Sequence, residues 1–135
     1  DIPEISALVL RQTKSDMNNE DGYLTVSEVK NLKIKADLVN LSACETGLGK
    51  VYAGEGVVGL TSAFMAAGAN GVIVSLWPVD DISTSMFMAG FYNKVNQGES
   101  YTHALSEVKR EFISGAFGEE YKKPYYWAPF VYYGK

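Results

Sequence analysis

This sequence has few cysteine and histidine side chains, which form disulfides and bind transition metals, and no long apolar run. It holds one cysteine, Cys44, and one histidine, His103. A single cysteine excludes a disulfide within the chain and is typical of a reducing compartment, so we expect a cytoplasmic protein. No apolar run reaches the roughly 20 residues that a membrane-spanning helix needs. We therefore expect no membrane segment, no metal site and no cofactor.

Charge of either sign is also modest. The 12 basic and 16 acidic residues give a net charge of −4, which argues against general binding to nucleic acid or anionic membranes. Apolar residues make up 47% of the chain and charged residues 21%, as is usual for a globular protein. Residues 1–135 are enough for one core, but Asp1 is neither an initiator Met nor the start of a signal-peptide pattern. We expect a single, partial domain.

Strand-like and helix-like stretches alternate along the chain. The strand-like runs are short and apolar: Ser6–Arg11, Ala36–Ser42, Gly71–Trp77 and Phe130–Tyr133. The helix-like runs repeat their apolar residues at helical spacing or start at a capping residue: Val26–Leu32, Gly54–Ala67 with Gly68 as its terminator, a stretch from near Ser83 that Gly98 closes, and another after Ser100. Gly115–Pro129 is aromatic and is expected to be irregular. This alternation predicts an α/β sandwich with a mainly parallel sheet.

A near match to a calcium-binding loop precedes the second predicted strand. Asn19, Asp21 and Glu28 stand at ligand places of that motif, but Met17 stands where an aspartate is needed. Thr25 and Glu28 also have the spacing of a capping box, which explains the same stretch by the start of a short helix. Calcium binding at Asn19, Asp21 and Glu28 is therefore the weaker alternative.

Cys44 is the candidate for chemistry. It follows the predicted strand Ala36–Ser42, and a loop with Gly47 and Gly49 comes after it. A residue in this place is expected at the carboxyl edge of the sheet, where open α/β folds bind their ligands. The small residues nearby leave room for the backbone of a bound peptide. The alternative is that Cys44 is a small, buried hydrophobic residue.

Two adjacent carboxylates, Asp80 and Asp81, follow the predicted strand Gly71–Trp77. They are expected on the same sheet edge as Cys44. An aspartate just before a helix is a favourable N-cap. We therefore expect one carboxylate to cap the next helix and the other to face a substrate groove.

Five sequence blocks, in one order, match the motifs of a known family. They are Leu41-Ser-Ala-Cys-Glu-Thr-Gly47, Gly54-Glu-Gly-Val-Val-Gly-Leu-Thr-Ser-Ala-Phe64, Ala67-Gly-Ala69, Val74-Ser-Leu-Trp-Pro-Val-Asp-Asp81 and Tyr125-Tyr-Trp-Ala-Pro-Phe-Val131. With them the chain resembles the CHAT family of caspase-like, separase-related cysteine peptidases, often fused to TPR repeats, from about Ser6 to its end. The resemblance implies a caspase-like three-layer α/β/α sandwich, of which this chain is a part.

The resemblance also implies residue roles. Cys44 matches the nucleophile, and its backbone N–H matches one donor to the oxyanion. Asp80 and Asp81 match an acidic pair, and Asp81 matches the aspartate that lines the pocket for a basic residue in separase-like relatives. The family's histidine belongs to a His-Gly motif on a strand upstream of Ser6–Arg11, which this chain lacks. His103 does not match it, and we expect His103 on a helix surface.

The resemblance implies an endopeptidase that cleaves a protein substrate through a Cys-His dyad. The histidine would come from an upstream segment with TPR repeats, and a partner protein would activate the enzyme, as in family members that act in bacterial defence. Because a free thiol titrates near about 8.5, the chain without that histidine is expected to be a poor peptidase. The alternative is a non-catalytic, caspase-like interaction module.

Overall fold

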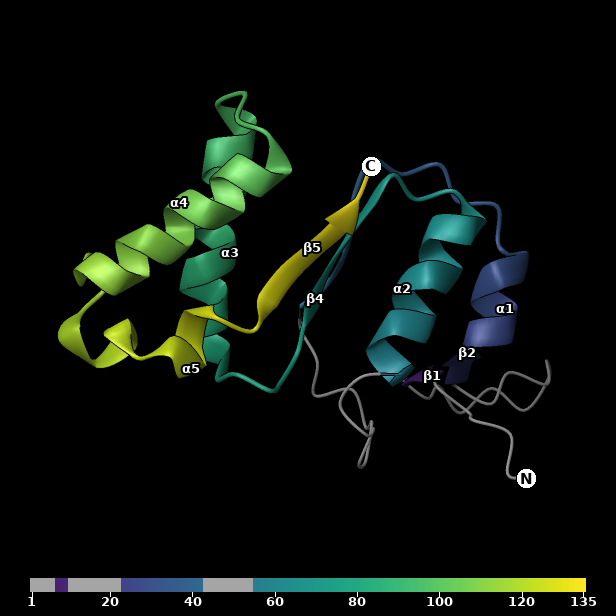
Figure 1. The fold of residues 1–135 in the computed structure, drawn as a ribbon, viewed down its shortest axis with the longest axis horizontal. Coiled ribbons are helices and arrows are strands. Elements are labelled where there is room, and N and C mark those ends of the chain that lie inside the picture. The colour runs from purple at the N-terminus through teal and green to yellow at the C-terminus, as the bar shows by residue number, and fades with distance from the viewer. Residues whose placement is uncertain (1–6, 10–22, 43–54) are drawn as a thin grey trace, which may run out of the picture. The chain divides into compact units, whose positions relative to one another are not determined.

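The computed structural model describes residues 7–9, 23–42 and 55–135 (Figure 1). The elements are β1 (Ala7–Val9), β2 (Tyr23–Thr25), α1 (Val26–Asn31), β3 (Val39–Leu41), α2 (Glu55–Ala67), β4 (Gly71–Ser75), α3 (Asp81–Asn96), α4 (Tyr101–Ser114), the 3₁₀ helix η1 (Glu119–Lys122), α5 (Pro124–Trp127) and β5 (Phe130–Gly134). They divide into two compact units, the first containing β1, β2, α1 and α2, the second α3, α4, η1 and α5. The predicted α/β class is confirmed.

In the first unit, β1 and β2 form an antiparallel pair with Ala7 opposite Thr25. Thr25 then begins α1 as its N-cap: its hydroxyl accepts from the N–H of Glu28 at 3.2 Å. In return, the Thr25 N–H donates to the Glu28 carboxylate at 2.8 Å. The capping box predicted from the sequence is therefore confirmed, and it engages the Glu28 carboxylate. Strand β2 was not expected, and Asn19 and Asp21 lie outside the described residues.

The junction after α2 needs a glycine. Gly68 has a φ of +119°, and a Cβ atom on it would lie 2.0 Å from the carbonyl oxygen of Ile34. This close approach comes with a hydrogen bond, since the Ile34 N–H donates to the Ala67 carbonyl oxygen at 2.8 Å. Gly68 ends α2 as the sequence predicts, because only glycine combines this backbone angle with the lack of a side chain.

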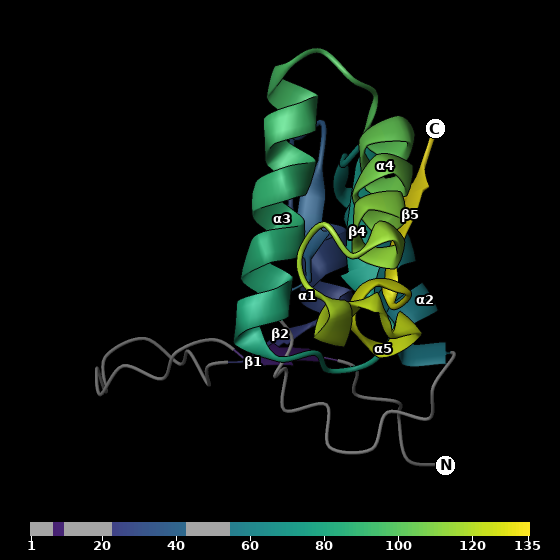
Figure 2. The ribbon, with the colours of Figure 1, turned by 90° about the vertical axis from the view of Figure 1, so that its left-hand side faces the viewer.

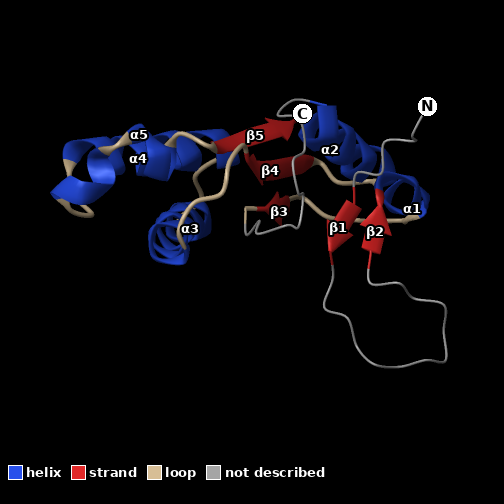
Figure 3. Cartoon of the chain, turned by 90° about the horizontal axis from the view of Figure 1, so that it is seen from below, coloured by secondary structure: helices blue, strands red, loops and turns tan. Residues whose placement is uncertain are grey.

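A three-stranded sheet has the order β3-β4-β5 (Figure 3). Residues 71–74 of β4 are buried, as the apolar run predicts. A parallel bridge between Ala36 and Ala69 leads into β3 and β4. The β4–β5 pair is antiparallel: the Leu76 N–H donates to the Pro129 carbonyl oxygen at one end, and the Lys135 N–H donates to the Asn70 carbonyl oxygen at the other. The described sheet is therefore mixed rather than mainly parallel, and the three-layer sandwich stays a prediction.

Aromatic residues form the core of the second unit, where α3 and α4 lie side by side (Figure 2). Phe87, Phe91, Phe112 and Phe130 are fully buried. The Phe87 ring lies 4.3 Å from that of Phe130 and 5.6 Å from that of Phe112, measured between centroids. Burying each such ring contributes about 1.5–3 kcal/mol. Helix α3 is thus fixed along its inner face.

The prediction that Gly115–Pro129 is irregular was wrong, because η1 and α5 lie within it. Both are single short turns without an apolar repeat, so periodicity could not reveal them. Pro124 stands in the first turn of α5, where its fixed φ favours a helix start and its missing N–H costs nothing. Over the described ranges, no helix is both long and apolar enough to cross a membrane.

Candidate functional site

The turn between β4 and α3 carries the predicted acidic pair. It leaves the sheet at Ser75, whose hydroxyl donates to the Trp77 carbonyl oxygen at 2.6 Å. The Leu76 N–H donates to the Pro129 carbonyl oxygen at 2.9 Å. These two bonds fix the direction in which the chain leaves β4. The start of α3 is therefore held at a defined place beside α5.

Helix α5 holds this turn through two aromatic side chains. The Trp77 indole N–H donates to the Tyr125 carbonyl oxygen at 3.0 Å, and the Tyr125 hydroxyl donates to the Pro78 carbonyl oxygen at 2.9 Å. Trp77 is 37% exposed and Tyr125 is 50% exposed. Each ring is thus anchored at its polar end while part of its apolar surface faces solvent. Rings held in this way can contact a ligand at little cost in conformational entropy.

Asp80 is the N-cap of α3. One of its carboxylate oxygens accepts from the Ser83 N–H at 2.9 Å, and the other accepts from the Ser83 hydroxyl at 2.7 Å. Ser83 is fully buried. These hydrogen bonds, first from the Ser83 backbone and then from its side chain, lower the pKa of Asp80 below its usual 3.8. Both oxygens of Asp80 are therefore occupied by the helix start.

The cap predicts a pH-dependent effect of Asp80→Ala. Losing an aspartate N-cap costs about 1 kcal/mol of unfolding free energy. Because the folded-state pKa of Asp80 is lowered, this stabilisation is present above the unfolded pKa of about 3.9 and is lost as the pH falls through the folded-state value. Urea unfolding should therefore show a larger penalty at pH 6 than at pH 2.5. Equal penalties at the two pH values would contradict the charged cap.

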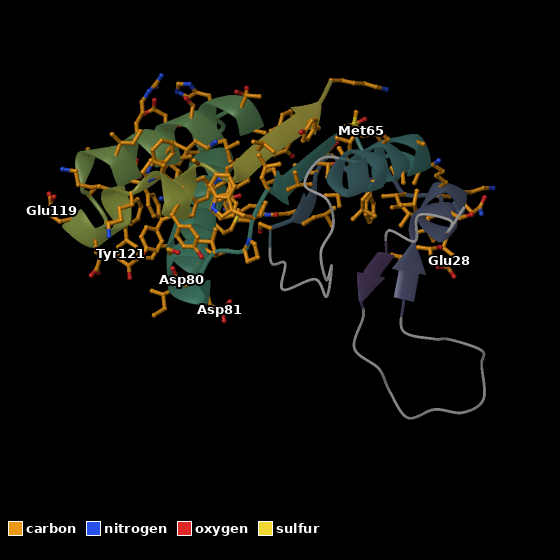
Figure 4. The ribbon with its side chains drawn as sticks, turned by 60° about the horizontal axis from the view of Figure 1, so that its bottom comes forward. Glu28, Met65, Asp80, Asp81, Glu119 and Tyr121 are labelled. Carbon is orange, nitrogen blue, oxygen red and sulfur yellow. The ribbon has the colours of Figure 1, made fainter. Side chains whose placement is uncertain are left out.

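Asp81 is the first residue of α3 and is exposed. Its carboxylate makes no hydrogen bond or ion pair with the residues that the structure describes. Figure 4 shows Asp80 and Asp81 together at the start of the helix. The positive end of the helix dipole favours a carboxylate here. Of the pair, Asp81 is the one whose oxygens remain available for a cation from outside.

Other acidic groups belong to the neighbouring η1. Burial raises the pKa of Tyr121, and the charges of Glu120 and Asp80 add to the rise. The carboxylates of Glu120 and Asp80 therefore both act on the Tyr121 hydroxyl, in the second unit. Glu119 is paired with Lys122 at 3.3 Å. Asp80 and Glu120 thus both lie near Tyr121, while Lys122 offsets the charge of Glu119.

The remaining site predictions have different outcomes. His103 lies on α4 with its side chain 59% exposed, 3.8 Å from the Glu99 carboxylate, so its predicted surface place is confirmed. Cys44 lies outside the described residues, and its role stays a prediction. Among the side chains that are described, no three His, Cys, Asp or Glu residues are grouped to hold a metal ion.

Sequence reasoning missed the contribution of Trp77 and Tyr125. Both stand in blocks that carry the family resemblance, but the hydrogen bond between them joins residues 48 apart in the chain. No local pattern predicts such a pair. The only sequence signal was the presence of aromatic residues in both blocks.

Comparisons with known proteins bear on the whole chain. The CHAT domain family matches residues 1–135. Tetratricopeptide repeat protein 28 from Homo sapiens is 37% identical over 111 residues, and the Mus musculus protein is 35% identical over the same length. These alignments cover 82% of this chain but only 4% of each relative, so the chain spans a small part of their length. The match over its full length shows that this chain belongs to the CHAT domain family.

Proposed function

We propose that this chain is the cysteine-bearing part of a CHAT-type endopeptidase with Cys44 as its nucleophile. The observation that carries the proposal is the family match over residues 1–135, together with the block Leu41-Ser-Ala-Cys-Glu-Thr-Gly47 that contains the only cysteine. The backbone N–H of Cys44 is proposed as one donor to the oxyanion. The caspase-like three-layer sandwich belongs to the same proposal.

The proposed reaction needs a histidine as well as the thiol. The histidine accepts the proton of the Cys44 thiol, the thiolate attacks the scissile carbonyl carbon, and the peptide amine leaves with that proton from the histidine. Water then hydrolyses the thioester and restores the thiol. Since His103 is an exposed residue that does not match the family motif, we place the histidine in a segment upstream of this chain. The chain by itself would then cleave poorly.

Asp81 is proposed to bind a basic side chain before the scissile bond. Asp80 already accepts two hydrogen bonds from Ser83, whereas the Asp81 carboxylate is exposed at the helix start. An arginine could bind such a carboxylate through two parallel hydrogen bonds. Since Asp80 is the helix cap, Asp81 is the residue of this pair that we assign to the substrate pocket.

The proposal also covers the setting in which the peptidase acts. The relatives are named for tetratricopeptide repeats, which supports a repeat region in the full-length protein. We place it upstream of this chain, with the segment that supplies the histidine. A protein substrate, an activating partner and a cytoplasmic place fit the family and the single cysteine. The role in bacterial defence is proposed from the family resemblance, since the two tetratricopeptide repeat relatives are mammalian.

The upstream histidine gives the test. In the full-length protein, alanine in place of the histidine of the His-Gly motif is expected to abolish cleavage of a peptide with arginine before the cut. Fluorescence polarisation of an uncleavable version of the peptide should still show binding. Undiminished cleavage by the alanine variant would contradict the Cys-His dyad.

A non-catalytic interaction module is the second candidate. One observation favours it, because the relatives are named for their repeats and not for a peptidase activity. The anchored, exposed rings of Trp77 and Tyr125 would suit a binding surface equally well. The two candidates differ upstream: a His-Gly pair at the end of an apolar strand favours the peptidase, and its absence favours the module.

A further inference from the structure

Asn40, in β3, uses both ends of its side-chain amide. Its NH₂ group donates to the Tyr92 hydroxyl at 2.8 Å and contacts the Met88 sulfur at 3.2 Å. Its carbonyl oxygen accepts from the backbone N–H of Ser42 at 3.0 Å. A half-buried amide would be unfavourable in a strand if it were unpaired, but this one has partners on both sides. The side chain therefore joins the end of β3 to α3.

The partners of Asn40 stand on a rigid support. Met88 and Tyr92 are four residues apart on α3 and so lie on the same side of the helix. The Tyr92 ring packs edge-on against the fully buried Phe91, with the centroids 5.0 Å apart. Because α3 is fixed to the core through Phe87 and Phe91, the amide of Asn40 has a fixed orientation. Its carbonyl oxygen therefore holds the N–H of Ser42 in a fixed direction.

The bond from Ser42 to Asn40 spans two residues, as in an Asx turn, and sets the direction of the backbone at the end of the strand. Ser42 precedes Cys44 by two positions in the sequence. We propose that Asn40, held by Tyr92, is a positioning residue for catalysis: it fixes the backbone at Ser42, two residues before the proposed nucleophile Cys44. This inference rests on the proposed role of Cys44 as the nucleophile. Positioning matters, because small misplacement of a nucleophile lowers the rate strongly without lowering binding equally.

The test compares three variants of the full-length protein. Asn40→Leu removes every hydrogen bond of the amide, and Tyr92→Phe removes only the hydroxyl that holds it. Asn96→Leu makes the same change as the first variant at an exposed position of α3 and serves as the control. Two rates are measured: peptide cleavage, and alkylation of Cys44 by iodoacetamide between pH 6 and 9, followed by mass spectrometry of the Cys44 peptide.

We expect kcat to fall about tenfold or more in Asn40→Leu and about threefold in Tyr92→Phe, with KM nearly unchanged. The pH profile of Cys44 alkylation should shift in both variants and stay as in the wild type in Asn96→Leu. Unchanged kcat and alkylation in Tyr92→Phe would overturn the inference. Tyr92→Phe keeps the ring and its contact with Phe91. If Asn40→Leu does not fold, kcat and the alkylation profile of Tyr92→Phe alone test the inference.

Failure of the proposed function has a different signature. If Cys44→Ala cleaves as well as the wild type, Cys44 is not the nucleophile and the peptidase proposal fails. The alkylation profile then still tests the structural half, since iodoacetamide reacts with a thiol whether or not it is catalytic. A shifted profile would support the link from Asn40 to the chain before Cys44, and an unshifted one would overturn it.

Discussion

Replacing Cys44 by alanine in the full-length protein is expected to lower kcat/KM for peptide cleavage by roughly 1000-fold or more. The reason is that the thiolate supplies the electron pair for the new bond to the carbonyl carbon, and alanine has no group that can do so. The measurement is hydrolysis of a fluorogenic peptide with arginine before the cut. The residual rate should be independent of thiol-blocking reagents.

Two controls separate chemistry from folding. Thermal unfolding of Cys44→Ala should match the wild type, since the change removes one sulfur atom. Cys44→Ser should be nearly as inactive as Cys44→Ala, because a serine hydroxyl ionises far less readily than a thiol near neutral pH. Equal activity of Cys44→Ala and the wild type would leave the interaction module as the better account.

Replacing Asp81 by asparagine is expected to lower kcat/KM for substrates with arginine or lysine before the cut by roughly 100-fold, while substrates with an apolar residue there change little. The substitution keeps the shape of the side chain but removes the charge that would pair with the cation. Since the Asp81 carboxylate is exposed and makes no bond to a described residue, the midpoint of thermal unfolding should stay nearly constant.

Neighbouring carboxylates supply matched controls. Glu120→Gln removes one negative charge from an exposed position on η1, and Asp80→Asn removes one from the cap itself. Both should affect cleavage after basic residues far less than Asp81→Asn does, because a general loss of charge acts weakly in water. A mainly destabilising effect of Asp81→Asn, or mapped cleavage sites with apolar residues before the cut, would show Asp81 to be only structural.

Local signals in the sequence predicted much of this fold. The capping residues Thr25 and Ser100 begin α1 and α4, and the predicted glycines Gly68 and Gly98 follow α2 and α3. These features depend on residues three or four apart, so the chain itself reveals them. A cap at one residue of the Asp80–Asp81 pair was also predicted, but the helix was expected from near Ser83, whereas α3 begins at Asp81 with Asp80 as its cap.

Contacts between distant residues could not be predicted in this way. The bond between Asn40 and Tyr92 joins residues 52 apart, and β5 pairs antiparallel with β4 although the alternation of elements suggested a mainly parallel sheet. Helix α5 has no periodicity to reveal it, and its hydrogen bonds with the turn at Trp77 and Pro78 depend on the folded chain. Such pairs arise from packing, which a pattern along the sequence does not contain.

Covalent labelling of Cys44 tests the central claim most directly. The full-length protein would be incubated with a peptidyl acyloxymethyl ketone that carries arginine at its reactive end, and the modified residue found by mass spectrometry. The account predicts one adduct on Cys44, formed much more slowly in Asp81→Asn and in the variant without the upstream histidine. A folded protein that gives no adduct on Cys44, or labels equally fast in all three forms, would contradict it.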